Sequence, residues 1–121
     1  MDRREIVRWL VLNHICDGYE SVVPYILPGV VKIGAKFGWI IDYSEVVESL
    51  AGLIADGLAK AYALSSEEPH YVPLEGMPPD DVMAEESFEA SFLATEVGVS
   101  EMKRLSEKHM SKDSWWPFDD D

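Results

Sequence analysis

The side chains through which this sequence could bind a metal ion or move a proton are three histidines, one cysteine and 23 carboxylates. His14 and Cys16 are two residues apart in a segment that we expect to be helical, so their side chains point roughly 160° apart and cannot share a metal ion. His70 has Glu67 and Glu68 nearby but no second His or Cys at ligand spacing. We therefore expect His14 and Cys16 to pack in the core and His70 to lie in a solvated loop.

Catalytic motifs are absent from the sequence. There is no Gly-x-Ser-x-Gly elbow, no Walker loop, no Gly-x-Gly-x-x-Gly and no Asp-x-Asp-x-Asp-Gly calcium loop. Nothing in the pattern places two carboxylates in an apolar cleft, which general acid–base catalysis requires. We therefore expect a protein that is not an enzyme, with no catalytic, cofactor-binding or metal-binding residues and no cofactor.

Composition and charge restrict the class of partner. A chain of 121 residues, 47% of them hydrophobic, suits one domain with a single core, and the lone cysteine excludes an internal disulfide. Residues 1–36 carry five bases and four acids, whereas residues 37–121 carry five bases and 19 acids. The net charge of −13 disfavours phosphate backbones and anionic membranes as partners. With no export signal and no membrane-spanning segment apparent, we expect a cytoplasmic protein.

The elements that must position these side chains begin with a helix over residues 2–16. It has two apolar stripes on opposite sides, Ile6/Leu10/His14 and Trp9/Leu12/Cys16. The second stripe is covered either by the rest of the chain or by another subunit, and both alternatives remain open.

The next helix is expected from about Pro28, because proline is tolerated in a first turn and breaks a helix interior. A third helix over 43–56 has Asp42 as N-cap, Glu45 completing a capping box, and Gly57 at the left-handed position after its end. Strands are predicted over 58–64 and 90–95, and Thr95 should cap a last helix over 96–110.

Between the strands lies a stretch that we call the acidic segment, residues 65–89. It contains eight acids, four prolines and no Lys or Arg, and a short helix is expected to start at Pro79. We predict a mainly α (α+β) fold with a three-helix core, a two-stranded β wing and a C-terminal helix. The domain is assigned to residues 1–112, with the acidic segment inserted in the wing, followed by an aromatic and acidic tail over 113–121.

Two stretches carry a resemblance to a known superfamily. SEVVESLAGLIADGLAKAYAL (44–64) and SFLATEVGVSEMKRL (91–105) resemble the third helix with its first wing strand, and the second wing strand with the last helix, of winged helix-turn-helix regulators such as the MarR-like and PadR-like families. The resemblance implies that the third helix enters the major groove of DNA and that the wing contacts the backbone. It places these positions on the exposed face of that helix: Ser44, Glu45, Glu48, Ser49 and Gly52.

Neither these positions nor the acidic segment holds a base, although affinity for DNA depends on Lys and Arg at phosphates. We therefore expect a regulatory winged-helix module that acts through protein contacts. One alternative is a DNA-binding transcriptional regulator, and another is an acidic decoy that mimics nucleic acid. Duplex DNA is an improbable partner that the sequence does not exclude, and in that alternative the phosphate contacts would come from Arg3, Arg4, Arg8, Lys32 and Lys36.

The tail sequence WWPF is the other unusual feature, because aromatic side chains are costly to leave in water. We expect these aromatics to fold back on the first helix, within one chain or across a homodimer. The resulting partner or dimer surface comprises Trp9, Leu12, Cys16, Trp115, Trp116 and Phe118.

Overall fold

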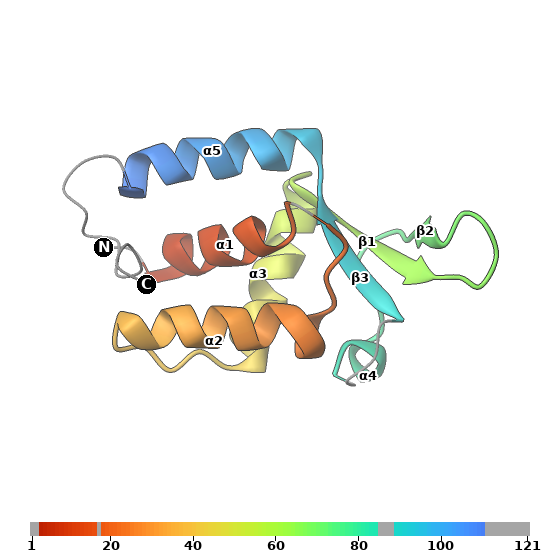
Figure 1. Cartoon of the computed structure of the whole chain (residues 1–121), viewed down its shortest axis with the longest axis horizontal. Coiled ribbons are helices and arrows are strands. Elements are labelled where there is room, and N and C mark those ends of the chain that lie inside the picture. Colours follow the sequence, from red (N-terminus) through yellow and green to blue (C-terminus); the bar gives the residue numbers. More distant parts are fainter. Residues whose placement is uncertain (1–2, 17, 85–88, 111–121) are drawn as a thin grey trace.

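The computed structural model describes residues 3–16, 18–84 and 89–110, with side chains described as far as Lys108. Five α-helices and a three-stranded antiparallel sheet make up this part of the chain. Helix α1 (Arg3–His14) lies between α5 (Glu96–Met110) and α2 (Leu27–Lys36), with α3 (Tyr43–Ala55) crossing them (Figure 1). The sheet stands at one end of this helical layer, and α4 (Asp80–Met83) lies beside it.

Helix α1 is buried on both sides, as its two apolar stripes require. Ile6 and Leu10 on one side and Trp9 and Leu12 on the other are at most 2% exposed. Trp9 packs toward α5, and its indole Nε1 donates a hydrogen bond to Ser106 Oγ at 3.0 Å. Trp9 and Leu12 of the second stripe are therefore covered by the chain itself, which is the first of the two alternatives given above.

Helix α2 begins at Leu27, within one residue of the predicted start at Pro28. A π-helical turn, η1 (Val22–Ile26), precedes it directly, so the helical path starts about one turn before Pro28. The amide of Ile26 donates to the carbonyl of Ser21, five residues back, at 3.0 Å. Pro28 has no N–H to donate. It lies in the first turn of α2, where an amide would have no acceptor within the helix, so the missing donor costs little.

Helix α3 begins and ends where the sequence predicts. Asp42 Oδ1 accepts a hydrogen bond from the amide of Glu45 at 3.0 Å, and Gly57 has a φ of 77° just beyond the helix end. Only half of the predicted capping box forms, because the Glu45 carboxylate binds Arg3 on α1 instead.

The sheet has three strands where two were predicted. Strand β1 (Ala59–Leu64) pairs with β3 (Ala90–Ala94) as expected, and β2 (Tyr71–Pro73) adds to its other edge in the order β2-β1-β3. The extra strand forms because the chain turns back after residue 64 and places Tyr71 opposite Leu64. In addition, Glu20 forms an isolated antiparallel bridge with Phe92, which joins the connection after α1 to the sheet.

The acidic segment is partly anchored to the helical core. The predicted short helix is present as α4, directly after Pro79, and its Met83 is buried. The hydroxyl of Tyr43 on α3 donates to Asp80 Oδ1 at 2.9 Å. Burial first and this carboxylate second raise the pKa of Tyr43 to about 12, so the hydroxyl keeps its proton at neutral pH.

The start of α5 is fixed against the end of α3. Thr95 caps α5 as predicted, with its Oγ1 accepting from the amide of Gly98 at 3.0 Å and donating to the carbonyl of Gly57 at 2.7 Å. Gly98 passes so close to Leu58 that a Cβ at this position would collide with the Leu58 carbonyl oxygen. None of the helices in the described part of the chain is long and apolar enough to cross a bilayer.

Candidate functional site

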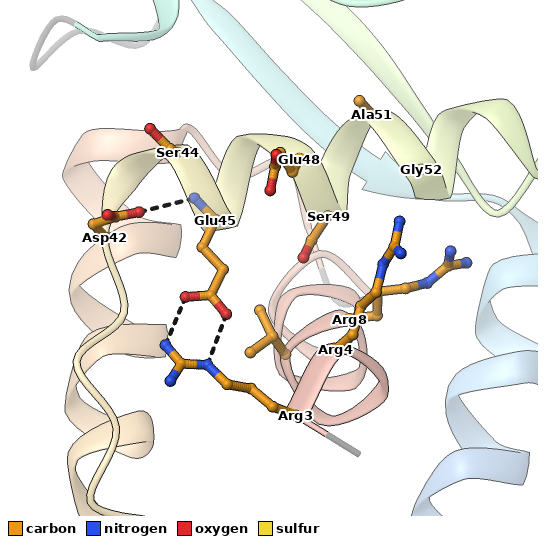
Figure 2. A pocket seen from close by; sticks show the side chains of 11 residues that line it. Arg3, Arg4, Arg8, Asp42, Ser44, Glu45, Glu48, Ser49, Ala51 and Gly52 are labelled. Atoms are coloured by element: carbon orange, nitrogen blue, oxygen red, sulfur yellow. Dashed lines mark hydrogen bonds and ion pairs between the residues drawn. The ribbon is translucent and has the colours of Figure 1, made fainter.

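A groove of about 930 Å³ lies between α1 and α3. Figure 2 shows three arginines rising from α1 toward the face of α3 that the resemblance assigns to the major groove of DNA. Three of the five bases that the sequence singled out therefore meet the predicted face of α3 at one place. The groove is lined by Arg3, Arg4, Val7 and Arg8 from α1, and by Asp42, Ser44, Glu45, Glu48, Ser49, Ala51 and Gly52 from the start and length of α3.

Arg3 closes one end of this groove. Its guanidinium binds the Glu45 carboxylate in a bidentate manner, with Nε to Oε2 at 3.0 Å and Nη2 to Oε1 at 2.8 Å. Nη2 also donates to the carbonyl of Ile40 at 2.8 Å, and the guanidinium carbon lies 5.4 Å from the centre of the Trp39 ring. The hydrogen bond with Glu45 raises the pKa of Arg3 above its usual range. Arg3 is thus held by the α2–α3 loop and by α3 together.

Arg8 lies toward the other end of the groove. Its Nη2 donates to Asp56 Oδ2 at 2.9 Å, just after α3 ends. Gly52 leaves the space that this guanidinium occupies, since a Cβ there would stand 3.3 Å from Arg8 Nη1. Arg4 lines the same groove one helical turn before Arg8. The arginines of α1 therefore face acids in α3 and just after it, and two ion pairs, Arg3 with Glu45 and Arg8 with Asp56, join these segments.

The face of α3 that the sequence predicts to be exposed is only partly so. Ser44 and Glu48 are exposed, Glu45 and Gly52 are half-buried, and Ser49 is buried with 8% of its surface accessible. The expectation of a fully exposed face is wrong for Ser49. The physical reason is that α1 packs along α3 on this side, and Arg3 and Arg8 bring their side chains over it.

The five bases proposed for phosphate contacts do not line one site. Arg3, Arg4 and Arg8 belong to the groove, whereas Lys32 and Lys36 are exposed on α2 and are not among the residues that line it. Which surface the arginines of α1 would join could not be predicted from the sequence.

The predicted partner surface is divided by the structure. Trp9 and Leu12 are buried inside the chain at 2% and 0% exposure, and Cys16 is half-buried. The remaining members, Trp115, Trp116 and Phe118, lie outside the described residues. In the single chain, the part of this surface that can be placed is therefore interior.

An aromatic group that the sequence analysis missed lies on the outward side of the sheet. Tyr19 stacks on Tyr71 with ring centres 3.8 Å apart, and it meets Tyr62 edge-on at 5.0 Å. The signal that could have found this group is the alternation along β1, where Tyr62 points away from the core residue Ala61. Because Tyr19 lies outside every predicted strand and Tyr71 lies in the acidic segment, nothing suggested that the three would meet.

The histidines behave as expected where the structure describes them. His14 is half-buried above Gly29, where a Cβ would collide with the imidazole ring, and burial lowers the pKa of His14. His70 is exposed, with Nε2 3.9 Å from Glu68. Among the described residues there is no group of three or more His, Cys, Asp or Glu side chains arranged to hold a metal ion.

Comparison of the chain with protein-family models, with curated proteins and with solved structures found no match.

Proposed function

We propose that this protein is a non-enzymatic winged-helix module that works through contacts with proteins. The order of elements supports the winged-helix part: three helices, a strand, an excursion with a short hairpin, a returning strand and a last helix. The pairing of Glu20 with Phe92 adds support, since it brings the connection between α1 and α2 to the edge of the same sheet.

The single observation that carries the functional part is that α1 and α3 neutralise each other. Arg3 binds Glu45 and Arg8 binds Asp56, so two of the bases closest to the face of α3 that would read DNA are already engaged. A phosphate would have to displace a carboxylate and then lie beside it. Each lost phosphate contact removes part of the salt-dependent affinity that holds proteins on DNA.

The alternative of a DNA-binding regulator keeps one specific observation in its favour. Arg3, Arg4 and Arg8 line one groove beside α3, and a rearrangement of the ion pairs would present three guanidinium groups together. The two functions differ in a measurable way, because binding to phosphates falls steeply as salt rises.

The deciding experiment is fluorescence anisotropy with a labelled random duplex, titrated at low salt and at about 150 mM salt. We expect no binding by the wild type at the higher salt. The variant Glu45→Gln/Glu48→Gln/Asp56→Asn removes the acids beside the arginines and should gain salt-dependent binding. The control Glu67→Gln/Glu68→Gln/Glu75→Gln changes the net charge equally within the acidic segment and should gain less.

Sub-micromolar binding by the wild type, with a steep dependence on salt, would make the DNA-binding regulator the better function. Equal gains by the two triple variants would show that net charge, and not the groove, governs any binding.

The simplest protein partner is a second copy of the chain, and sedimentation velocity tests it. A wild type that stays monomeric at high micromolar concentration in both low and high salt would exclude the homodimer and leave a different protein as the partner. Association that tightens with salt would support the homodimer, because the net charge of −13 repels like copies.

A further inference from the structure

The outward face of the sheet is built from aromatic side chains of three separate segments. Strand alternation directs Lys60, Tyr62 and Leu64 of β1 to the side opposite the core alanines. Tyr71 is paired with Leu64, and Tyr19 reaches across from the segment before Glu20 to stack on Tyr71. We call Tyr19, Tyr62 and Tyr71 the tyrosine face.

This face is accessible even though its members are in contact. Tyr19 is 37% exposed and Leu64 is 47% exposed, while Tyr62 and Tyr71 are half-buried. The stacked and edge-on contacts fix the ring orientations, so little side-chain entropy remains to be lost on binding. Rigid tyrosines with accessible faces are typical of the central contacts of protein interfaces.

The connection that follows the tyrosine-bearing strand β1 is rich in acids. The acidic segment follows β1 directly and contains β2, so Glu67 and Glu68 lie in the connection between Leu64 and Tyr71. No Lys or Arg occurs in residues 65–89, and Lys60, which shares the outward side of β1 with Tyr62, lies at the end of the strand away from Glu67 and Glu68. A partner that approaches Tyr71 therefore meets carboxylates at its margin.

Resting on the proposed function in protein contacts, we propose that the tyrosine face docks a partner segment that carries arginine side chains. A guanidinium stacks on an aromatic ring by a cation–π contact, and it also pairs with carboxylates through two parallel hydrogen bonds. Both partners are present here, Tyr19 and Tyr71 for stacking and Glu67 and Glu68 for pairing. A second copy of the chain and a nucleic acid fit less well, because each would bring negative charge to negative charge.

The test uses the full chain and three peptides of one length: acetyl-Arg-Gly-Arg-Gly-Arg-amide, its lysine counterpart and its glutamine counterpart. Binding is followed by amide chemical shifts in ¹H–¹⁵N spectra of the protein. We expect the arginine peptide to shift the amides around Tyr19 and Tyr71 and to bind more tightly than the lysine peptide, because an ammonium lacks the planar stacking surface. The glutamine peptide should cause no shifts.

Three variants separate this site from general attraction to an acidic protein. Tyr19→Ala/Tyr71→Ala should weaken binding of the arginine peptide about tenfold. Tyr19→Phe/Tyr71→Phe keeps the rings and should bind like the wild type. Tyr25→Ala, which removes another exposed tyrosine on η1, should leave binding unchanged.

Equal affinity of the wild type and Tyr19→Ala/Tyr71→Ala would overturn the proposal, as would shifts centred elsewhere on the protein. If the double alanine variant does not fold, the shift map of the wild type and the ranking of the three peptides still decide the matter. The duplex assay reports separately on the proposed function, so a missing arginine site with no DNA binding would overturn this inference alone.

Discussion

The groove between α1 and α3 and the acidic segment both contain many carboxylates, and the structure uses them differently. In the groove, Glu45 and Asp56 each bind an arginine of α1. In residues 65–89 there is no Lys or Arg in the sequence, and Asp80 binds the neutral hydroxyl of Tyr43. The first set of acids joins two helices, whereas the second leaves its charge for interaction with solvent or a partner.

Burial follows the same division. The helical part buries both sides of α1, while Leu64, just before the acidic segment, and Val72 within it are 47% and 40% exposed. The buried sides of α1 therefore contribute to stability, and the recognition surface that we propose lies on the tyrosine face beside the acidic segment. Changes in the two regions should therefore have unequal effects on folding.

The largest difference in the free energy of unfolding is expected between glutamate substitutions at two leucines. Leu12→Glu places a charge at a position that is 0% exposed and should cost more than about 4 kcal/mol, enough to unfold much of the protein. Leu64→Glu, at 47% exposure, should change the free energy of unfolding by less than about 1 kcal/mol. Urea denaturation followed by circular dichroism measures both. A folded Leu12→Glu protein of wild-type stability would show that α1 is not covered from within the chain.

A smaller difference in the free energy of unfolding is expected between alanine substitutions at two glycines. Gly98→Ala drives a Cβ into the backbone of Leu58 and should destabilise the protein by about 2–3 kcal/mol. Gly76→Ala, within the acidic segment, meets no atom within 4 Å, and its φ of 76° should cost only about 1 kcal/mol. Chemical denaturation compares them, and a reversed order would contradict the close approach of α5 to β1.

The ion pair between α1 and α3 should give a modest and salt-dependent effect. Arg3→Lys loses the bidentate geometry with Glu45 and should lower the melting temperature, more so at low salt than at high salt. Glu67→Gln in the acidic segment should leave it unchanged or raise it slightly by reducing repulsion. Calorimetry at two salt concentrations would reveal the pair, and an Arg3→Lys curve identical to the wild type would argue against it.

The smallest expected effect is a pH dependence of the free energy of unfolding, caused by His14. Burial lowers the pKa of His14, so the folded state resists protonation and the stability from neutral His14 is present above about pH 6.5. This stability is lost as the pH falls through the lowered pKa of the folded state. The free energy of unfolding of the wild type, relative to His14→Gln, should therefore decrease on acidification. His70→Gln, at an exposed histidine, is the matched control and should leave the pH dependence caused by His14 in place.

Local signals made the ends of helices predictable. Asp42 with Gly57 marks the two ends of α3, and Thr95 marks the start of α5, because caps depend on residues three or four positions apart. The strands β1 and β3 were predictable from alternation and composition. These elements were enough to predict that the fold contains both α-helices and β-strands.

Contacts between distant segments were not predictable in this way. The pair of Arg3 with Glu45 spans 42 positions, and it exists because α1 happens to cross α3 at that point. Strand β2 has only three residues, too few for a periodic signal, and its register with β1 is set by the turn between them. The tyrosine face depends on that register and was therefore invisible in the sequence.

Thr95 has a consequence for how the molecule opens. Its one hydroxyl group accepts from the amide of Gly98 and donates to the carbonyl of Gly57, and its own amide donates to the carbonyl of Leu58. The first turn of α5 therefore cannot fray without also releasing the turn that follows α3. Amide hydrogen exchange in these two turns is then a single cooperative event, and the lifetime of one turn is set by the lifetime of the other.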